Sequence, residues 1–182
     1  KGKGAMMAIL GLEIKDINKI LSEHKDKFLC YIANDNSNGQ TVVSGNTDSI
    51  DKFGEVLSNN NIRYVKLPVS APFHCPLMNK ATEQMKQKIL DTQFKDPKID
   101  IVSNVTAKPL KSSIDIKRLL VEQIEKPVRW RESVQNIINL GINQFIEIGP
   151  GKVLSGLIKR IDRNIKLNQV NNLEDLNTLT ND

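Results

Sequence analysis

The chain divides at one stretch of sequence, which reads Leu67-Pro68-Val69-Ser70-Ala71-Pro72-Phe73-His74-Cys75-Pro76-Leu77-Met78. Pro72 and Pro76 restrict the backbone on both sides of His74, where a predicted strand ends and a predicted helix begins. A histidine held on such a turn has a fixed direction, which a general base requires. The other histidine, His24, lies in a charged run. The sequence contains no Gly-x-Ser-x-Gly elbow, so this base lacks a nucleophile of that kind.

The residues before this stretch alternate between apolar runs and amphipathic segments. Short apolar runs bounded by turn residues predict strands, and apolar residues at helical spacing predict helices. The order β-α-β-β-α-β is typical of a ferredoxin-like unit, which we place at residues 4–69. The predicted elements are strands at 4–12, 28–33, 40–44 and 62–69, a helix at 14–25, and a helix capped by Thr47 or Asp48.

The residues after the histidine predict strands separated by helices, which indicates a parallel sheet. Three strands make an incomplete sheet, so we interpret residues 70–170 as the C-terminal part of a larger α/β domain. Leu77, Ala81, Met85 and Ile89 are spaced four apart and predict a helix whose apolar face points inward. The predicted strands lie at 98–105, 144–148 and 165–170, the further helices at 114–125, 131–140 and 151–161, and a polar tail at 171–182.

Composition excludes several classes of protein. No apolar run approaches the roughly 20 residues that cross a bilayer, and no signal peptide is visible, so we expect no membrane partner. We expect a cytoplasmic protein on the separate ground that reduced thiols fit that compartment. Two cysteines, Cys30 and Cys75, are too few for a disulfide framework or a zinc site. We interpret both as small buried thiols, although Cys75 beside His74 leaves a nucleophile open. We expect no cofactor and no metal, and the start at Lys1 suggests a cut chain.

The charge leaves three interpretations of the surface. A net charge of +5 fits a solvated lysine-rich surface, attraction of an acidic or phosphate-bearing partner, or nucleic-acid binding. RNA-binding modules of ferredoxin-like topology stack bases on paired aromatic residues of their strands. In the strand predicted at 28–33 only Phe28 and Tyr31 qualify, and aromatic residues make up 4% of the chain. We therefore expect no nucleic-acid partner.

Three other motifs each have a structural and a functional interpretation. Gly149-Pro150-Gly151-Lys152 fails as a Walker A motif, because Ile146 and Val153 stand where glycine and Ser or Thr are required. It is either a tight strand-to-helix turn or a helix N-terminus that helps bind an anion. The asparagine-rich loop predicted at Asn34–Gly39 is either a plain hairpin turn or a set of amides that face a polar substrate. Gln123 is either a solvated helix residue or part of a site.

Together these pieces resemble the malonyl-CoA:acyl carrier protein transacylase family, the acyltransferases of fatty-acid synthesis. The resemblance covers nearly the whole chain, to about Val170. The five segments that carry it are, in order, Gly4-Ala5-Met6-Met7-Ala8-Ile9-Leu10-Gly11-Leu12; Asn34-x-Asn36-Ser37-x-Gly39-Gln40-x-Val42-Val43-Ser44-Gly45; Leu67-Pro68-Val69-Ser70-x-Pro72-Phe73-His74-Cys75-x-Leu77-Met78; Gln123-x3-Pro127-Val128-x-Trp130; and Glu147-Ile148-Gly149-Pro150-Gly151-Lys152-Val153-Leu154.

The resemblance implies a fold, a reaction and a set of site residues. The fold is an α/β-hydrolase-like domain with an inserted ferredoxin-like subdomain, and the reaction is ping-pong through an acyl-serine. The serine takes malonyl from malonyl-CoA and passes it to the phosphopantetheine thiol of acyl carrier protein. Motif matching implies that His74 is the general base and that Gln123 orients it through its backbone carbonyl. It also implies that Asn34 and Asn36 lie on a cleft-lining loop and bind substrate.

Three active-site elements of the family are not found in this sequence. The family's Gly-His-Ser-x-Gly elbow, its malonyl-binding arginine and its oxyanion-hole glutamine all lie upstream of the segment matched here. We therefore interpret the chain as a C-terminal portion that is inactive alone. Two alternatives stay open: a noncatalytic or split-enzyme piece that needs an N-terminal partner, and an acyltransferase of other acyl specificity. Phe73 after Pro72 is the one local hint of malonyl.

Overall fold

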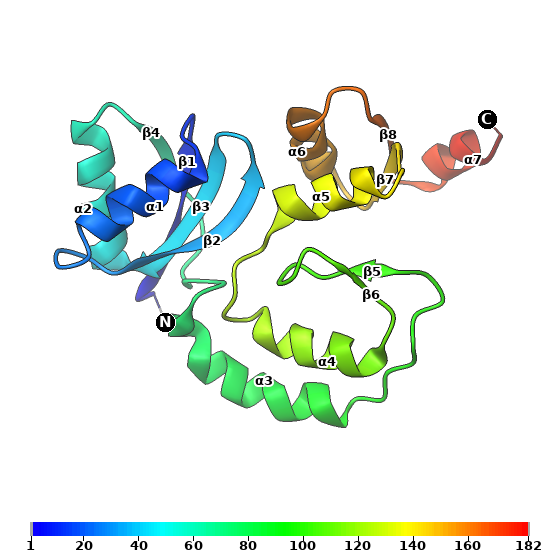
Figure 1. Cartoon of the computed structure of the whole chain (residues 1–182), viewed down its shortest axis with the longest axis horizontal. Helices are drawn as coiled ribbons and strands as arrows, with labels where there is room; N and C mark the ends of the chain where they lie inside the picture. The colour runs from blue at the N-terminus through cyan, green and yellow to red at the C-terminus, as the bar shows by residue number, and fades with distance from the viewer. Residues whose placement is uncertain (1, 182) are drawn as a thin grey trace. The chain divides into compact units, whose positions relative to one another are not determined.

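The computed structural model describes residues 2–181, and the chain divides into two compact units (Figure 1). The first extends to Ser133 and the second begins at Val134. Both units combine helices with β-structure, so the protein has the mixed α/β character that the sequence predicts.

The first unit begins with a four-stranded antiparallel sheet whose strands lie in the order β2-β3-β1-β4. Met7 and Ile9 of one strand pack with residues of both helices in one core cluster, whereas Met6 and Ala8 belong to a second cluster. Because successive strand residues face opposite sides, both helices cover the same face of the sheet. The elements are β1 (Gly4–Leu10), α1 (Ile14–Glu23), β2 (Cys30–Ser37), β3 (Gln40–Asn46), α2 (Thr47–Asn59) and β4 (Arg63–Lys66).

The asparagine-rich stretch after Ala33 is mostly strand, so the loop predicted at Asn34–Gly39 is wrong. Strand β2 continues to Ser37, and the turn to β3 contains only Asn38 and Gly39. Gly39 has a φ of +70°, which favours glycine. Asparagine and serine favour turns locally, but pairing with β3 on one side and with Val128 on the other satisfies the backbone of an extended strand.

Helix α2 is capped one residue before the predicted positions. The cap is Asn46, whose side-chain oxygen accepts a hydrogen bond from the backbone N–H of Ser49 at 2.7 Å. Thr47 and Asp48 instead form the first turn of the helix. An N-cap asparagine satisfies one of the backbone donors that every helix leaves free at its start.

The rest of the first unit is less regular than predicted. Two helices, α3 and α4, lie beside each other, and a two-stranded antiparallel hairpin lies between them in the sequence (Figure 1). The strand predicted at 98–105 is therefore only a short hairpin strand. The helix predicted around Leu77 and Met85 is present as η1 and α3, but its apolar face is not buried as predicted: Leu77 and Met85 are 45% exposed, whereas Ala81 and Ile89 are half-buried. The elements are η1 (Pro76–Met78), α3 (Asn79–Asp91), β5 (Ile101–Val102), β6 (Pro109–Leu110) and α4 (Ser113–Glu122).

The second unit contains a parallel strand pair joined by a helix. Helix α5 spans the boundary between the units, and β7 and β8 pair in parallel over five residues each. Most of the described residues in the polar tail predicted at 171–182 form helix α7. The elements are α5 (Trp130–Asn139), β7 (Gln144–Ile148), α6 (Val153–Ile161), β8 (Lys166–Val170) and α7 (Leu173–Asn181).

Candidate active site

His74 lies on a strained turn that is anchored against β1. Its φ is +60°, a left-handed conformation that costs energy for any residue other than glycine. The Sγ atom of Cys75 donates a hydrogen bond to the carbonyl of Pro72 at 3.1 Å. Gly4 of β1 approaches so closely that a Cβ atom there would lie 2.2 Å from Cδ of Pro72. The structure therefore fixes the direction of His74, as the prolines of the sequence predict.

The ring of His74 is held by one backbone carbonyl. Its Nδ1 atom lies 2.9 Å from the carbonyl oxygen of Gln123. Because a carbonyl oxygen can only accept a hydrogen bond, Nδ1 carries the proton. In the neutral ring Nε2 then has a free lone pair, which is the form a general base requires.

Gln123 owes its position to the end of α4 and to the hairpin before that helix. It is the C-cap of α4, and its backbone N–H donates to the carbonyl of Leu119 at 2.9 Å. Its side-chain Oε1 accepts a hydrogen bond from Nδ2 of Asn104 at 3.4 Å, and the carbonyl of Asn104 accepts from the N–H of Arg129 at 2.9 Å. Asn104 is thus a neighbour of the site that the sequence analysis missed.

An apolar cavity of about 400 Å³ adjoins His74 within the first unit. His74 and Gln123 supply its polar groups, and the other walls are apolar. Phe73 is 42% exposed and Met85 45% exposed. The lining residues are Phe73, His74, Met78, Met85, Ile89, Leu120, Gln123 and Ile124. The arrangement therefore combines an oriented imidazole with space for a largely apolar group.

Asn34 and Asn36 lie on β2 rather than on a loop, and both are half-buried. Asn34 forms a parallel bridge with Val128, which follows Gln123 closely in the sequence. Strand β2 therefore lies beside the segment that follows Gln123, the residue whose carbonyl bonds His74. The family resemblance implies that all four are site residues, and the structure joins His74 to Gln123 directly by a hydrogen bond.

The surroundings of the two cysteines favour a role in packing. Cys75 is 1% exposed, and its thiol donates to the Pro72 carbonyl, an arrangement that favours packing over nucleophilic attack. Burial, and to a lesser extent the nearby Cys75, raises the pKa of Cys30 to about 12, so its thiol stays protonated at neutral pH. Among the described residues, no group of three or more His, Cys, Asp or Glu side chains could hold a metal ion.

The start of α6, just after the Gly149–Lys152 turn, binds a carboxylate of the protein itself. Glu147 accepts hydrogen bonds from the backbone N–H groups of Leu154 and Ser155, at 3.0 and 2.7 Å, and from the Ser155 hydroxyl at 2.6 Å. Desolvation raises the pKa of Glu147, but the hydrogen bonds from Ser155 and the backbone outweigh it and lower the pKa overall. Since these amides already bind a carboxylate, the structure favours the tight-turn interpretation over an anion site.

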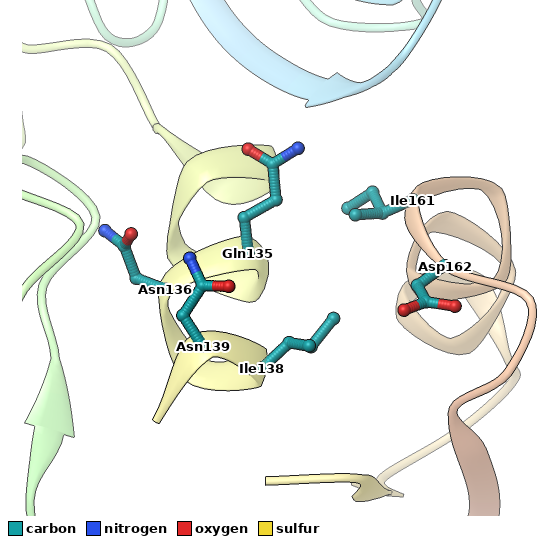
Figure 2. A pocket seen from close by; sticks show the side chains of 6 residues that line it. All are labelled: Gln135, Asn136, Ile138, Asn139, Ile161 and Asp162. Atoms are coloured by element: carbon teal, nitrogen blue, oxygen red, sulfur yellow. The ribbon is translucent and has the colours of Figure 1, made fainter. Parts of the chain in front are cut away.

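A second hollow, of about 390 Å³, lies within the second unit. Figure 2 shows the amide side chains of α5 on one side and two residues at the end of α6 on the other. Its lining residues are Gln135, Asn136, Ile138, Asn139, Ile161 and Asp162. Amides and one carboxylate offer hydrogen bonds but neither an oriented base nor a nucleophile, so the cavity beside His74 is the better candidate for an active site.

None of the helices in residues 2–181 is long and apolar enough to cross a membrane.

An oriented imidazole beside an apolar cavity on an α/β scaffold is an arrangement that can serve proton transfer. The chain belongs to the acyl transferase domain family, which residues 1–175 match. This confirms the resemblance seen in the sequence.

Two curated relatives, both named malonyl CoA-acyl carrier protein transacylase, come from Bacillus subtilis and Staphylococcus aureus (strain MSSA476). They are 40% identical to this chain over 167 and 177 residues, covering 91% and 96% of it. The chain spans 53% and 58% of the length of these two relatives.

Solved structures agree with these relatives. An acyl-carrier-protein-S-malonyltransferase from Bartonella henselae matches 99% of this chain with a TM-score of 0.93 and 40% identity, over 58% of that enzyme's length. A complex of a type II PKS acyl-carrier protein with its malonyl-transacylase matches all of this chain with a TM-score of 0.93 and 35% identity, over 60% of that chain.

Proposed function

We propose that this chain supplies the general base of a malonyl-CoA:acyl carrier protein transacylase of fatty-acid synthesis. The observation that carries the proposal is the 2.9 Å hydrogen bond from Nδ1 of His74 to the Gln123 carbonyl, which leaves Nε2 free to accept a proton. The relatives named malonyl CoA-acyl carrier protein transacylase support this reaction. The two unpaired thiols, Cys30 and Cys75, are in keeping with a cytoplasmic enzyme.

The reaction has two half-reactions that use the same base. In the first, Nε2 of His74 takes the proton of a serine hydroxyl as its oxygen attacks the malonyl thioester, and coenzyme A leaves with that proton as its thiol. In the second, His74 takes the proton of the phosphopantetheine thiol while its sulfur attacks the malonyl-serine. The serine then leaves and recovers its proton from His74. Asn34 and Asn36 would bind polar atoms of the substrate from strand β2.

We infer that the serine belongs to a Gly-His-Ser-x-Gly segment which precedes Lys1 or is supplied by another chain. The chain's span of 53% and 58% of its relatives supports this inference. So do the exposed Leu77 and Met85. We further propose that residues 4–69 are a ferredoxin-like subdomain and that 70–170 complete an α/β-hydrolase-like domain. The antiparallel order β2-β3-β1-β4, with both helices on one face, supports the first assignment.

The proposal is tested by mixing this chain with the elbow-bearing segment of a relative, such as the Bacillus subtilis enzyme. We expect transfer of labelled malonyl from malonyl-CoA to acyl carrier protein only when both pieces are present. The control is the same mixture with the elbow serine replaced by alanine. Transfer by the elbow segment alone, at the rate of the mixture, would contradict the proposed role of this chain.

A second candidate function is transfer of an uncharged acyl group. The observation that favours it is the apolar lining of the cavity beside His74, which includes no arginine or lysine. A malonyl carboxylate requires a cationic partner, which the family supplies upstream of the matched segment. Competition between malonyl-CoA and acetyl-CoA in the reconstituted mixture distinguishes the two: preference for malonyl supports the first proposal, and preference for acetyl the second.

A further inference from the structure

An ion pair between Asp35 and Arg131 joins strand β2 to the start of α5. Arg131 is close in sequence to Gln123, whose carbonyl bonds His74. Nε of Arg131 lies 3.0 Å from both carboxylate oxygens of Asp35, and Nη2 lies 2.9 Å from Oδ2. The side chains of Arg131 and Asp35 are 24% and 13% exposed, so water screens this pair less than a surface pair. Contact through two nitrogens fixes orientation as well as distance.

Backbone hydrogen bonds fasten the same segment to the same strand. The N–H of Asp35 donates to the carbonyl of Val128 at 2.9 Å, and the N–H of Val128 donates to the carbonyl of Ala33 at 2.8 Å. Between Gln123 and Val128 the chain contains Pro127, which restricts its own backbone and that of Lys126. The Gln123 carbonyl is therefore connected to β2 by a short segment with little freedom.

Asp35 lies between the two asparagines of the proposed substrate site. Along β2 the residues Ala33, Asp35 and Ser37 are buried, whereas Asn34 and Asn36 are half-buried. Strand β2 has register shifts between Ile32 and Asn34 and between Asp35 and Ser37, so burial and not strict alternation distinguishes these side chains. The ion pair therefore holds β2 through a buried residue that lies in sequence between the two half-buried asparagines.

We propose that Asp35 and Arg131 are a positioning pair, whose contact holds the Gln123 carbonyl in place beside β2 and so keeps His74 protonated at Nδ1. Neither residue touches the reacting atoms. The catalytic meaning of the pair rests on the proposed function, but its effect on the His74 ring is a property of this chain and does not depend on catalysis.

The test is the tautomer of His74, read from long-range ¹H–¹⁵N NMR spectra of the whole chain at alkaline pH. The chain has two histidines, and the second is an internal reference, since Nδ1 of His24 lies 3.0 Å from the carbonyl of Ile20 in α1. The first variant is the double substitution Asp35→Asn with Arg131→Gln, which removes both charges and leaves no unpaired buried carboxylate. The second is Arg131→Lys, which keeps the charge but loses the two-nitrogen contact.

We expect the ratio of Nδ1–H to Nε2–H tautomer of His74 to fall about threefold or more in the double variant, and less in Arg131→Lys. His24 should not change. The matched control is Arg118→Gln, because Arg118 forms exposed ion pairs with Asp115 and Glu122 on the helix that ends before Gln123. That substitution should leave the His74 ratio as it is.

An unchanged His74 ratio in the double variant, with the amide signals of β1–β3 intact, overturns the proposal. If the double variant loses those signals, the Arg131→Lys variant decides instead. A change in the tautomer ratio of His74 but not of His24 supports the positioning pair. An unchanged His74 ratio, or an equal change in the His24 ratio, overturns it. Malonyl transfer in the reconstituted mixture is a separate readout. A chain whose His74 responds as expected but supports no transfer contradicts the proposed function and not the positioning pair.

Discussion

Nδ1 of His74 and the carbonyl oxygen of Gln123 lie 2.9 Å apart, although 49 positions separate the two residues in the sequence. The first residue is on a strained turn and the second caps a helix. One hydrogen bond therefore sets both the proton position and the direction of the ring.

Replacing His74 by alanine should nearly abolish malonyl transfer in the reconstituted mixture. A general base usually contributes about a hundredfold to ten-thousandfold, so we expect turnover to fall by that factor. The matched control is His24→Ala, which removes a ring that bonds the Ile20 carbonyl at the end of α1. It should leave turnover unchanged. A loss of less than about tenfold in His74→Ala would remove His74 from the role of general base.

The isolated chain should not form a covalent malonyl adduct with malonyl-CoA. Ser37 and Ser44 are buried, at 2% and 0% exposure, and the exposed Ser70 has no oriented base assigned to it. Intact-mass measurement after incubation should show the unmodified chain, whereas a mixture with the elbow segment should label that segment. A malonyl group mapped to any serine of this chain would contradict the inference that the nucleophile lies elsewhere.

Substituting Gly4 by alanine should destabilise the turn that carries His74. The added Cβ would lie 2.2 Å from Cδ and 2.6 Å from the backbone nitrogen of Pro72, and the backbone atom has little room to move. We expect a loss of about 1–3 kcal/mol in the free energy of unfolding, measured by urea denaturation. Gly156→Ala is the comparison, because that glycine lies in α6 with no heavy atom within 4 Å of its added Cβ.

In Gly156→Ala the helix containing the substitution should be more stable, by about 1 kcal/mol, since alanine favours a helix interior more than glycine does. Equal stability of the Gly4→Ala variant and the unsubstituted chain would show that β1 and the histidine turn move apart without cost. In that case the turn would not be anchored by Gly4.

The turn that carries His74 can be inferred from the sequence, but the contacts around it cannot. Pro72 and Pro76 restrict the backbone locally, so the turn at His74 can be inferred from adjacent residues. The contact with Gln123 cannot be inferred that way, because it depends on tertiary folding; it came from the family resemblance. The contact between Asp35 and Arg131 could not be inferred either, because the two residues are 96 positions apart and neither local sequence indicates the partner.

Each wrong local prediction has a physical cause. Asn34 and Asn36 have the composition of a turn, but pairing with β3 and Val128 keeps them in a strand. The helix around Met85 has the spacing of a buried face, but spacing reports which side is apolar and not whether anything covers it. In the strand, residues distant in sequence decide the outcome, and local composition does not report them.

The two parts of the chain should differ in hydrogen exchange. Residues 4–69 contain a four-stranded sheet covered by two helices, whereas the β-structure of residues 98–170 consists of the two-stranded pairs β5–β6 and β7–β8. Two-stranded sheets are marginal alone, and edges without partners open readily. We expect slow exchange at the amides of 4–69 and much faster exchange at those of 98–170, measured by mass spectrometry on the isolated chain.

Adding the elbow-bearing segment should slow exchange in 98–170 and leave 4–69 nearly unchanged, because the proposed sheet neighbours would then satisfy the free strand edges. The control is an unrelated protein at the same concentration, which should protect neither part. Equal and high protection of both parts without the segment would show that 98–170 folds alone. That result would overturn the interpretation of an incomplete α/β domain, even if the mixture still transferred malonyl.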